Sequence, residues 1–309
     1  MTLSKTELTQ LIKSKAKNLG FFDTGISKAR QLKEQEPNLH SWLKECMHGE
    51  MQYMENHYEK RLDPRKLVEG SKSVITVLQN YYPDREIPEE NNYKISKYAY
   101  GEDYHILIKD KLMELLREIE SVTGQVSARA FTDSAPIMDK VWAREGGLGW
   151  IGKNTCLINK KQGSFFFIGQ LIINLDLEYD EPFLADHCGS CDRCIKACPT
   201  GAIIKPFQLD ARKCISYLTI EYRKAFPEGS AKRLQNWIFG CDICQDVCPW
   251  NKKAIAHKEE RLRAPEKLVR MRKPGWNNLS KDDFDKIFKG SAVSRVKYHD
   301  LMRNIQEAQ

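Results

Sequence analysis

Apolar residues in the first part of the chain follow both the helical and the extended period. Residues 4–18 carry leucine, isoleucine and alanine at i, i+3 and i+4 spacing, which predicts an amphipathic helix. The β-branched run at 73–78 predicts a buried strand, and 126–131 is also strand-like. Residues 103–122 place five aliphatic side chains on one face and predict a long helix that ends at Gly124.

A second strong β region follows at 163–177, which predicts either one bent strand or two strands broken at Gly169. Residues 93–104 interleave Tyr and Lys, a pattern typical of an amphipathic strand edge, although it could also stack on bases or a flat cofactor. His48 favours an ordinary surface or capping role. Ser280 predicts the cap of a helix in the C-terminal segment. Helices and strands therefore mix around one sheet.

Asp133 lies between the end of a predicted strand and the start of a predicted helix, and Pro136 lies in the first turn of that helix. This position alone favours a helix cap. A cap accepts backbone N–H groups, which lower the pKa of a carboxyl, whereas a proton donor needs an apolar environment without such donors. The residues leave both roles open.

Residues Gly147 to Lys153 fit G-x4-G-K, the spacing of a phosphate-binding loop. However, Asn154 replaces the Ser or Thr that would hold magnesium, and the segment follows a predicted helix rather than a strand. We therefore predict a glycine-rich turn that lets the backbone approach a ligand or another strand. No G-x-G-x-x-G follows a strand, so a dinucleotide-binding fold has no support.

Eight of the ten cysteines fall between residues 188 and 248. The first run has the spacing C-x2-C-x2-C-x3-C-P, and the second has C-x2-C-x3-C-P. The cysteine before each proline points to the other cluster in two-cluster ferredoxins. The pattern thus predicts one [4Fe–4S] cluster on Cys188, Cys191, Cys194 and Cys248, and a second on Cys198, Cys214, Cys241 and Cys244.

Zinc and disulfides are the alternatives to clusters. A zinc site favours two separated C-x-x-C pairs rather than overlapping ones closed by Cys-Pro. Disulfides need an oxidising compartment, and the N-terminus shows neither a signal region nor a twin arginine. No stretch approaches the length of a membrane span. We expect a cytoplasmic protein with no membrane association.

The formal net charge of +7 comes from residues 249–309, where 15 Lys and Arg face 8 Asp and Glu. The rest of the chain is balanced. A basic segment beside a neutral body suggests a polyanion, most plausibly nucleic acid. A solvated, helix-rich segment is the alternative.

Several further motifs accompany the cysteines, and together they cover almost the whole chain. They are His48-Gly-Glu-Met-Gln-Tyr, Arg61-Leu-Asp-Pro-Arg, Tyr100-Gly-Glu-Asp-Tyr-His, Thr132-Asp-Ser, Gly152-Lys-Asn-Thr-Cys, Lys213-Cys-Ile-Ser and Gly240-Cys-Asp-Ile-Cys. This set closely resembles the epoxyqueuosine reductases. The resemblance implies a cobalamin-dependent oxidoreductase with two [4Fe–4S] clusters. It implies the last step of queuosine synthesis, reduction of an epoxide on a modified anticodon base of tRNA.

The resemblance also implies roles for single residues. Asp133 matches the proposed proton donor, which overturns the preference for a cap. Cofactor-contacting positions match Arg61, Leu157, Ile168 and Ser216, for which a surface salt bridge and core packing are the plain alternatives. Ser96 stands where some relatives have a cysteine near the cobalt, so that cysteine is not essential to the chemistry.

The predicted fold class is α+β, with an α/β cobalamin-binding catalytic domain around one sheet (1–185), a ferredoxin-like two-cluster domain (186–255) and a basic helical tail (256–309). Many relatives continue into a helical-repeat domain, so the tail here would carry more of the tRNA binding. A reductive dehalogenase and a plain electron-transfer ferredoxin are the rival functions. We expect a monomer that receives electrons from a donor protein or small reductant.

Overall fold

A four-stranded sheet lies at the centre of the N-terminal half. The computed structural model describes residues 3–227, 229 and 231–308. The strand order is β1-β2-β7-β4, and every pairing in this sheet is antiparallel. Ile75 in the central strand β2 lies opposite Ile26 of β1 and Leu171 of β7. The strands are β1 (Asp23–Lys28), β2 (Ser73–Asn80), β4 (Ala128–Phe131) and β7 (Phe166–Ile173). An antiparallel sheet with helices on its faces is the α+β arrangement that the sequence predicts.

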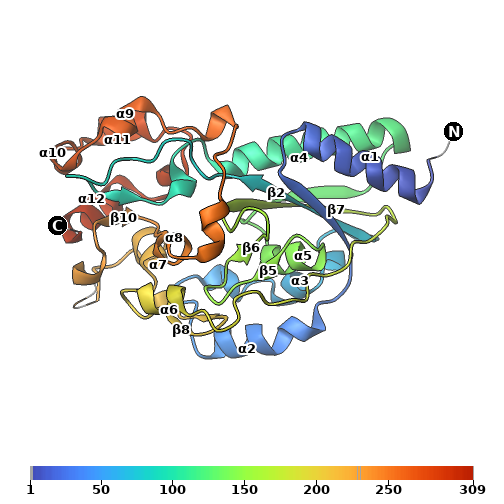
Figure 1. Cartoon of the computed structure of the whole chain (residues 1–309), viewed down its shortest axis with the longest axis horizontal. Helices are drawn as coiled ribbons and strands as arrows, with labels where there is room; N and C mark the ends of the chain where they lie inside the picture. Colours follow the sequence, from blue (N-terminus) through green and yellow to red (C-terminus); the bar gives the residue numbers. More distant parts are fainter. Residues whose placement is uncertain (1–2, 228, 230, 309) are drawn as a thin grey trace.

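Two helices cover one face of this sheet, α1 (Lys5–Asn18) and α4 (Tyr104–Thr123), which lie side by side in Figure 1. Ser4 and Glu7 form a reciprocal capping box at the start of α1. The buried apolar stripes of both helices pack on β2 and β7 and form the largest core of this half.

Strand β7 runs through Gly169 without a break, so of the two predicted alternatives the structure has the single strand and not two strands divided at Gly169. A Cβ atom at Gly169 would stand 2.5 Å from Cγ2 of Ile108 in α4. The glycine allows the helix to approach the sheet closely, and it does not interrupt the strand.

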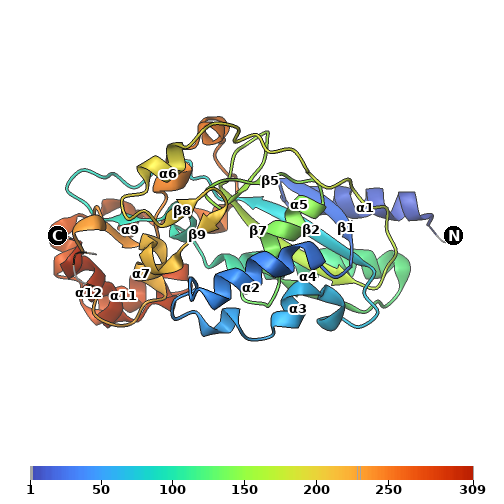
Figure 2. The same cartoon turned by 90° about the horizontal axis from the view of Figure 1, so that it is seen from below.

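The opposite face of the sheet is covered by α5 (Asp139–Glu145) and by the hairpin of β5 (Trp150–Ile151) and β6 (Leu157–Ile158). Trp142 of α5 is fully buried against this face. The helices α2 (Glu36–Lys44) and α3 (Tyr58–Leu62) lie on the same side of the sheet (Figures 1 and 2).

The cysteine-rich segment forms short elements joined by loops. They are α6 (Arg193–Ala197), β8 (Ile203–Lys205), β9 (Gln208–Leu209), α7 (Ile215–Ile220), β10 (Trp237–Phe239) and α8 (Ile243–Asp246). Helices α6 and α8 lie within the first and the second cysteine run and pack against each other.

The C-terminal segment folds onto the rest of the chain through a second core. Its helices are α9 (Glu266–Arg270), α10 (Lys273–Asn277), α11 (Lys281–Ile287) and α12 (Tyr298–Glu307). Trp276 and Phe288 from this segment pack with Phe239 of β10 and with Ile95 of β3 (Lys94–Ile95), which pairs with β10 in parallel. Ser280 caps α11, as predicted. Tyr93 and Tyr100 are buried in this same core, which agrees with a strand edge and not with exposed stacking residues.

Several basic residues of this segment are paired with acids. Arg261 contacts Glu102 and Asp110, and Lys267 contacts Asp283. Within the described ranges no helix is long and apolar enough to cross a membrane.

Candidate active site and cluster loops

Asp133 lies on the loop between β4 and α5, and its backbone has a left-handed φ of +52°. Helix α5 begins only at Asp139, after Met138, and has no side-chain cap bond. The positional preference for Asp133 as a helix cap is therefore wrong. The carboxylate is instead directed to side chains from other parts of the chain, and 57% of the side chain is exposed.

Three groups converge on the Oδ2 atom of Asp133. The hydroxyl of Tyr104 donates to it at 2.6 Å, and Nε2 of His105 lies 3.3 Å away. Nη1 of Arg295 lies 3.6 Å away. Desolvation opposes the charged carboxylate, but the hydrogen bonds from His105 and Tyr104 and the charge of Arg295 outweigh it and lower the pKa of Asp133 to about 2.

His105 bridges two carboxylates at the start of α4. Its Nδ1 atom lies 2.7 Å from Oδ1 of Asp103, the residue that caps this helix. Burial lowers the pKa of His105, but the hydrogen bonds with Asp103 and Asp133 prevail and raise it to about 9. These pKa values place the proton of the pair on His105 and leave Asp133 ionised, although Nη1 of Arg295 lies 3.2 Å from the same Nε2 atom.

The roles of Tyr104, His105 and Arg295 were not predicted from the sequence. Tyr104 and His105 directly follow Asp103, the residue that caps α4, and this run of three polar or titratable side chains at a helix start could have indicated a site. Arg295 ends a short 3-10 turn at Ala292–Arg295 and reaches the site through the fold of the C-terminal segment. No local pattern identifies it.

Arg61 on α3 lies near the same site and is buried. Its Nη2 atom donates to the carbonyl of Tyr53 at 3.0 Å, and its Nε atom has no hydrogen-bond partner among the described residues. Burial lowers the pKa of Arg61. Burial raises the pKa of Tyr53, and the charges of Glu221 and Asp133 raise it further, whereas the charges of Arg295 and Arg61 lower it.

Asp139, at the start of α5, is a half-buried acid that interacts with Arg61. Burial, reinforced by the charge of Asp133, raises its pKa to about 7. Its Oδ1 atom has no hydrogen-bond partner among the residues described.

Leu157 and Ile168 contribute to one apolar wall. Both belong to a cluster with Leu78 and Phe166 on the face of the sheet that α5 covers. The hydroxyl of Thr132 donates to the carbonyl of Ile168 at 3.0 Å, so the Asp133 loop is attached directly to this wall.

The two serines lie nearer to the cysteine loops. Ser96 is buried, and its hydroxyl donates to Asp242, which follows Cys241. Its hydroxyl is thus committed to the cysteine loop. Ser216 is half-buried in the first turn of α7, two residues after Cys214.

The eight predicted cluster ligands fall into two groups of neighbouring thiols. Burial raises the pKa of Cys194 to about 11, with further contributions from Cys188, Cys248 and Cys191. Burial likewise raises the pKa of Cys241, with contributions from Cys214 and Cys198, and Cys244 interacts first with Cys156, which is not a predicted ligand, and then with Cys214 and Cys241. All ten cysteines are free thiols. Across the described ranges no three His, Cys, Asp or Glu side chains converge on one metal-ion position.

A buried polar network holds the second cysteine loop against residues that flank β2 and β7 of the N-terminal sheet. The amide of Asn251 donates to Ser164 Oγ at 3.0 Å and to the Gln245 carbonyl at 2.7 Å. The Gln245 amide in turn donates to Ser164 and Tyr81. These hydrogen bonds therefore fix the position of the second cysteine loop.

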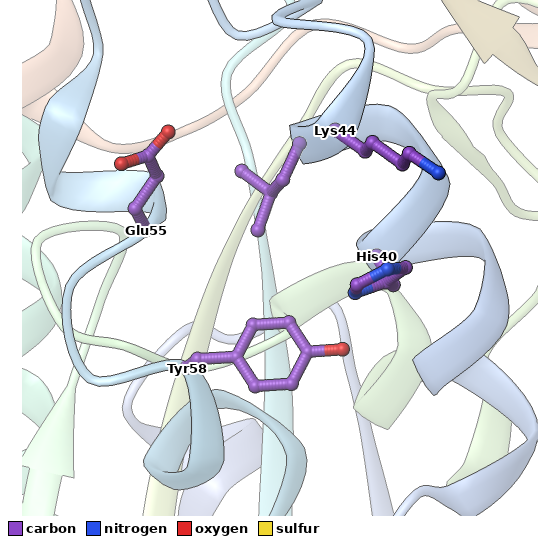
Figure 3. A pocket seen from close by; sticks show the side chains of 5 residues that line it. His40, Lys44, Glu55 and Tyr58 are labelled. Atoms are coloured by element: carbon purple, nitrogen blue, oxygen red, sulfur yellow. The ribbon is translucent and has the colours of Figure 1, made fainter.

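An open hollow of about 550 Å³ lies between α2 and the start of α3. Figure 3 shows His40, Lys44, Glu55 and Tyr58 around it. None of the predicted site residues lines it. Buried His48 lies close by, with Nε2 3.0 Å from Glu55, which contradicts the expected surface position of this histidine.

Comparison with known families identifies both halves of this arrangement. Residues 61–134 match the family described as "Epoxyqueuosine reductase QueG, DUF1730", and residues 187–251 match a "4Fe-4S double cluster binding domain". An epoxyqueuosine reductase from Cyclobacterium marinum is 51% identical over 96% of this chain and 95% of its own length. The chain belongs to the epoxyqueuosine reductase family.

Other members of the family agree. The Escherichia coli epoxyqueuosine reductase is 39% identical over 99% of this chain and 82% of its own length. A crystal structure of an epoxyqueuosine reductase with an epoxyqueuosine-modified tRNA-Tyr stem loop superposes with a TM-score of 0.91 at 26% identity, over 99% of this chain and 81% of that one. A Bacillus subtilis structure of the family has its catalytic aspartate loop swung out of the active site. A catabolic reductive dehalogenase reaches a TM-score of 0.54 at 17% identity, which shows shared fold alone.

Proposed function

We propose that this chain reduces epoxyqueuosine to queuosine in the anticodon loop of tRNA. The observation that carries the proposal is Asp133, held by His105, Tyr104 and Arg295 in a fold that matches a tRNA-bound family member. Converting an epoxide to an alkene consumes two electrons and two protons and releases the oxygen as water. Both carbon–oxygen bonds of the epoxide break, so the site must supply two electrons to the carbons and two protons to the departing oxygen.

The two thiol groups fit two [4Fe–4S] clusters, which pass single electrons. The first cluster would be held by Cys188, Cys191, Cys194 and Cys248, and the second by Cys198, Cys214, Cys241 and Cys244. Thiolates are the ligands that such clusters require, and Cys198 and Cys248 each lie with the other run, as the Cys-Pro spacing predicts. The source of electrons is a donor protein or a small reductant.

The residues near Arg61 fit cobalamin, which when bound supplies the reducing metal centre that no side chain provides. The buried Arg61 offers an Nε donor without a protein partner, and Leu157 and Ile168 offer an apolar wall. Ser216 would contact the cofactor from α7. Ser96 would lie near it through its backbone and Cβ, because its hydroxyl is held by Asp242.

Asp133 would deliver the proton that lets the epoxide oxygen leave. With a pKa of about 2 the carboxylate does not store a proton at neutral pH, whereas His105, with a pKa of about 9, does. One of the two protons would pass from His105 Nε2 through Asp133 Oδ2 to the oxygen, and the second would come from solvent, to which the Asp133 side chain is exposed. Asp103 would keep the imidazole oriented, and Tyr104 would hold the carboxylate in place.

The proposed division of labour follows three regions. Residues 1–185 would carry the cofactor and Asp133, residues 186–255 the clusters, and residues 256–309 a basic segment that meets tRNA. A base in a loop is open to stacking and edge contacts, which suits recognition in a single-stranded region.

Activity can be tested on anaerobically reconstituted protein with cobalamin, a strong reductant and epoxyqueuosine-containing tRNA, followed by mass spectrometry of the base. Conversion to queuosine supports the proposal. Absence of conversion by protein that holds both clusters and cobalamin refutes it and favours a reaction on another substrate.

A further inference from the structure

The G-x4-G-K segment, which has no phosphate-binding role in the proposed reaction, contains β5 and ends in the tight turn between β5 and β6. A Cβ atom at Gly152 would stand 2.4 Å from Cδ1 of Ile158, and Thr155 has a left-handed φ of +64°. The backbone closes on itself through bonds from Gly152 N to Cys156 O at 2.8 Å and from Thr155 N to Gly152 O at 2.8 Å. The turn is therefore a defined shape that holds its side chains in fixed directions.

Lys153 at the tip of this turn reaches the loop of the first cysteine run. Its Nζ atom donates to the carbonyl of Gly189 at 2.5 Å and to that of Cys191 at 2.9 Å. Its own carbonyl accepts a bond at 3.1 Å from the backbone N–H of Phe207, next to β8 and β9. One residue of the catalytic half thus makes three bonds to the cysteine-rich segment.

Asn154 makes the corresponding contact with the second run. Its Nδ2 atom donates to the carbonyl of Cys244 at 3.3 Å, while its Oδ1 atom accepts from the backbone of Cys156 at 3.3 Å. Adjacent residues of one turn therefore bond to the backbone of one predicted ligand from each cluster, Cys191 and Cys244.

These contacts have different electrostatic consequences. A [4Fe–4S] cluster gains negative charge on reduction, so a fixed positive charge beside its loop favours the reduced state. Lys153 brings a full charge to the loop of the first cluster, whereas Asn154 brings only an amide dipole to the second. If the turn were only structural, the hydrogen bonds of Lys153 to the carbonyls of Gly189 and Cys191 would be needed, but the positive charge of its ammonium would not.

We propose that Lys153 is a positioning residue for the first cluster and that its ammonium raises the reduction potential of that cluster relative to the second. This inference rests on the two-cluster assignment of the proposed function. It gives the glycine-rich turn a role in electron supply.

The test uses full-length, anaerobically reconstituted protein without tRNA. Lys153→Gln keeps an amide donor but removes the charge, and Lys153→Arg keeps the charge. Lys160→Gln is the matched control, since Lys160 lies two residues beyond β6 on the same hairpin and is exposed. Iron content and potentiometric titration followed by electron paramagnetic resonance report on each cluster.

In Lys153→Gln we expect the ratio of reduced to oxidised first cluster at a fixed potential to fall by about tenfold, which is about 59 mV for a one-electron couple. The second cluster, Lys153→Arg and Lys160→Gln should keep wild-type values. Loss of about half the iron in Lys153→Gln alone would also support the positioning role.

Three results would overturn the inference: unchanged potentials in Lys153→Gln with full iron, an equal shift of both clusters, or an equal shift in Lys160→Gln. Wild-type protein that binds only one cluster would instead overturn the two-cluster assignment itself. The two failures are therefore distinguishable without any measurement of turnover.

Discussion

The proton supply can be tested by removing a partner of His105 that does not touch Asp133. In Asp103→Asn the side chain still caps α4, but its carboxylate charge is lost. Burial lowers the pKa of His105, but the hydrogen bonds and charges of Asp103 and then Asp133 outweigh burial and raise it from its ordinary 6.5 to about 9. This difference corresponds to about 3 kcal/mol in favour of the protonated ring. The side chain of His105 is only 17% exposed, so solvent screening leaves most of this free-energy difference intact.

The sign of the effect follows from the raised pKa. The stabilisation is complete below about pH 6.5 and is lost as the pH rises through about 9, where His105 deprotonates. If His105 supplies the proton, the rate should fall along the same upper limb. Because Asp103 is the leading favourable partner, its neutralisation should move that limb toward neutral pH by at least about one pH unit.

The assay is a single turnover of pre-reduced enzyme at a series of pH values, with the alkene product measured by mass spectrometry. Asp110→Asn is the control, because it removes an exposed carboxylate from the same helix without touching His105. The reasoning is refuted if Asp103→Asn and wild type have superimposable profiles, or if Asp110→Asn shifts the limb equally.

Three further outcomes follow from the structure. Arg295→Gln should retain both clusters and lower the single-turnover rate by no more than about fivefold, because a half-exposed ion pair contributes up to about 1 kcal/mol. A hundredfold or larger loss of rate would show that Arg295 does more than support Asp133. Gly169→Ala should lower the free energy of unfolding by about 1–3 kcal/mol in denaturant titrations, because the new Cβ meets Ile108, and unchanged stability would contradict that packing. Binding of tRNA should weaken steeply between low and moderate salt if residues 256–309 contact phosphates, and equal affinity at both would argue against that role.

Local patterns predicted the elements whose residues determine them locally. The helices over 5–18 and 104–123 and strand β2 lie where apolar periodicity places them, because their buried faces are defined by neighbouring residues. The assignment of cysteines to two groups also follows from short-range spacing, and the proximity of the thiols supports it.

Features that depend on distant contacts were not predicted. Gly169 marks the approach of α4 and not a strand end, and Asp133 precedes its helix by too many residues to cap it. Arg295 joins Asp133 only because the C-terminal segment packs on β3 and β10. Many charges of the basic segment are paired with acids, so net charge alone overstated the free positive surface.

The most direct test of the central claim compares wild type with Asp133→Ala and Asp133→Asn in the conversion of epoxyqueuosine in tRNA. All three proteins are first shown to hold equal iron and cobalamin. The account predicts queuosine formation by wild type and loss of about a hundredfold or more in both variants, as expected for removal of a general acid. Conversion by all three at similar rates would contradict the proposed role of Asp133, and conversion by none would contradict the proposed reaction.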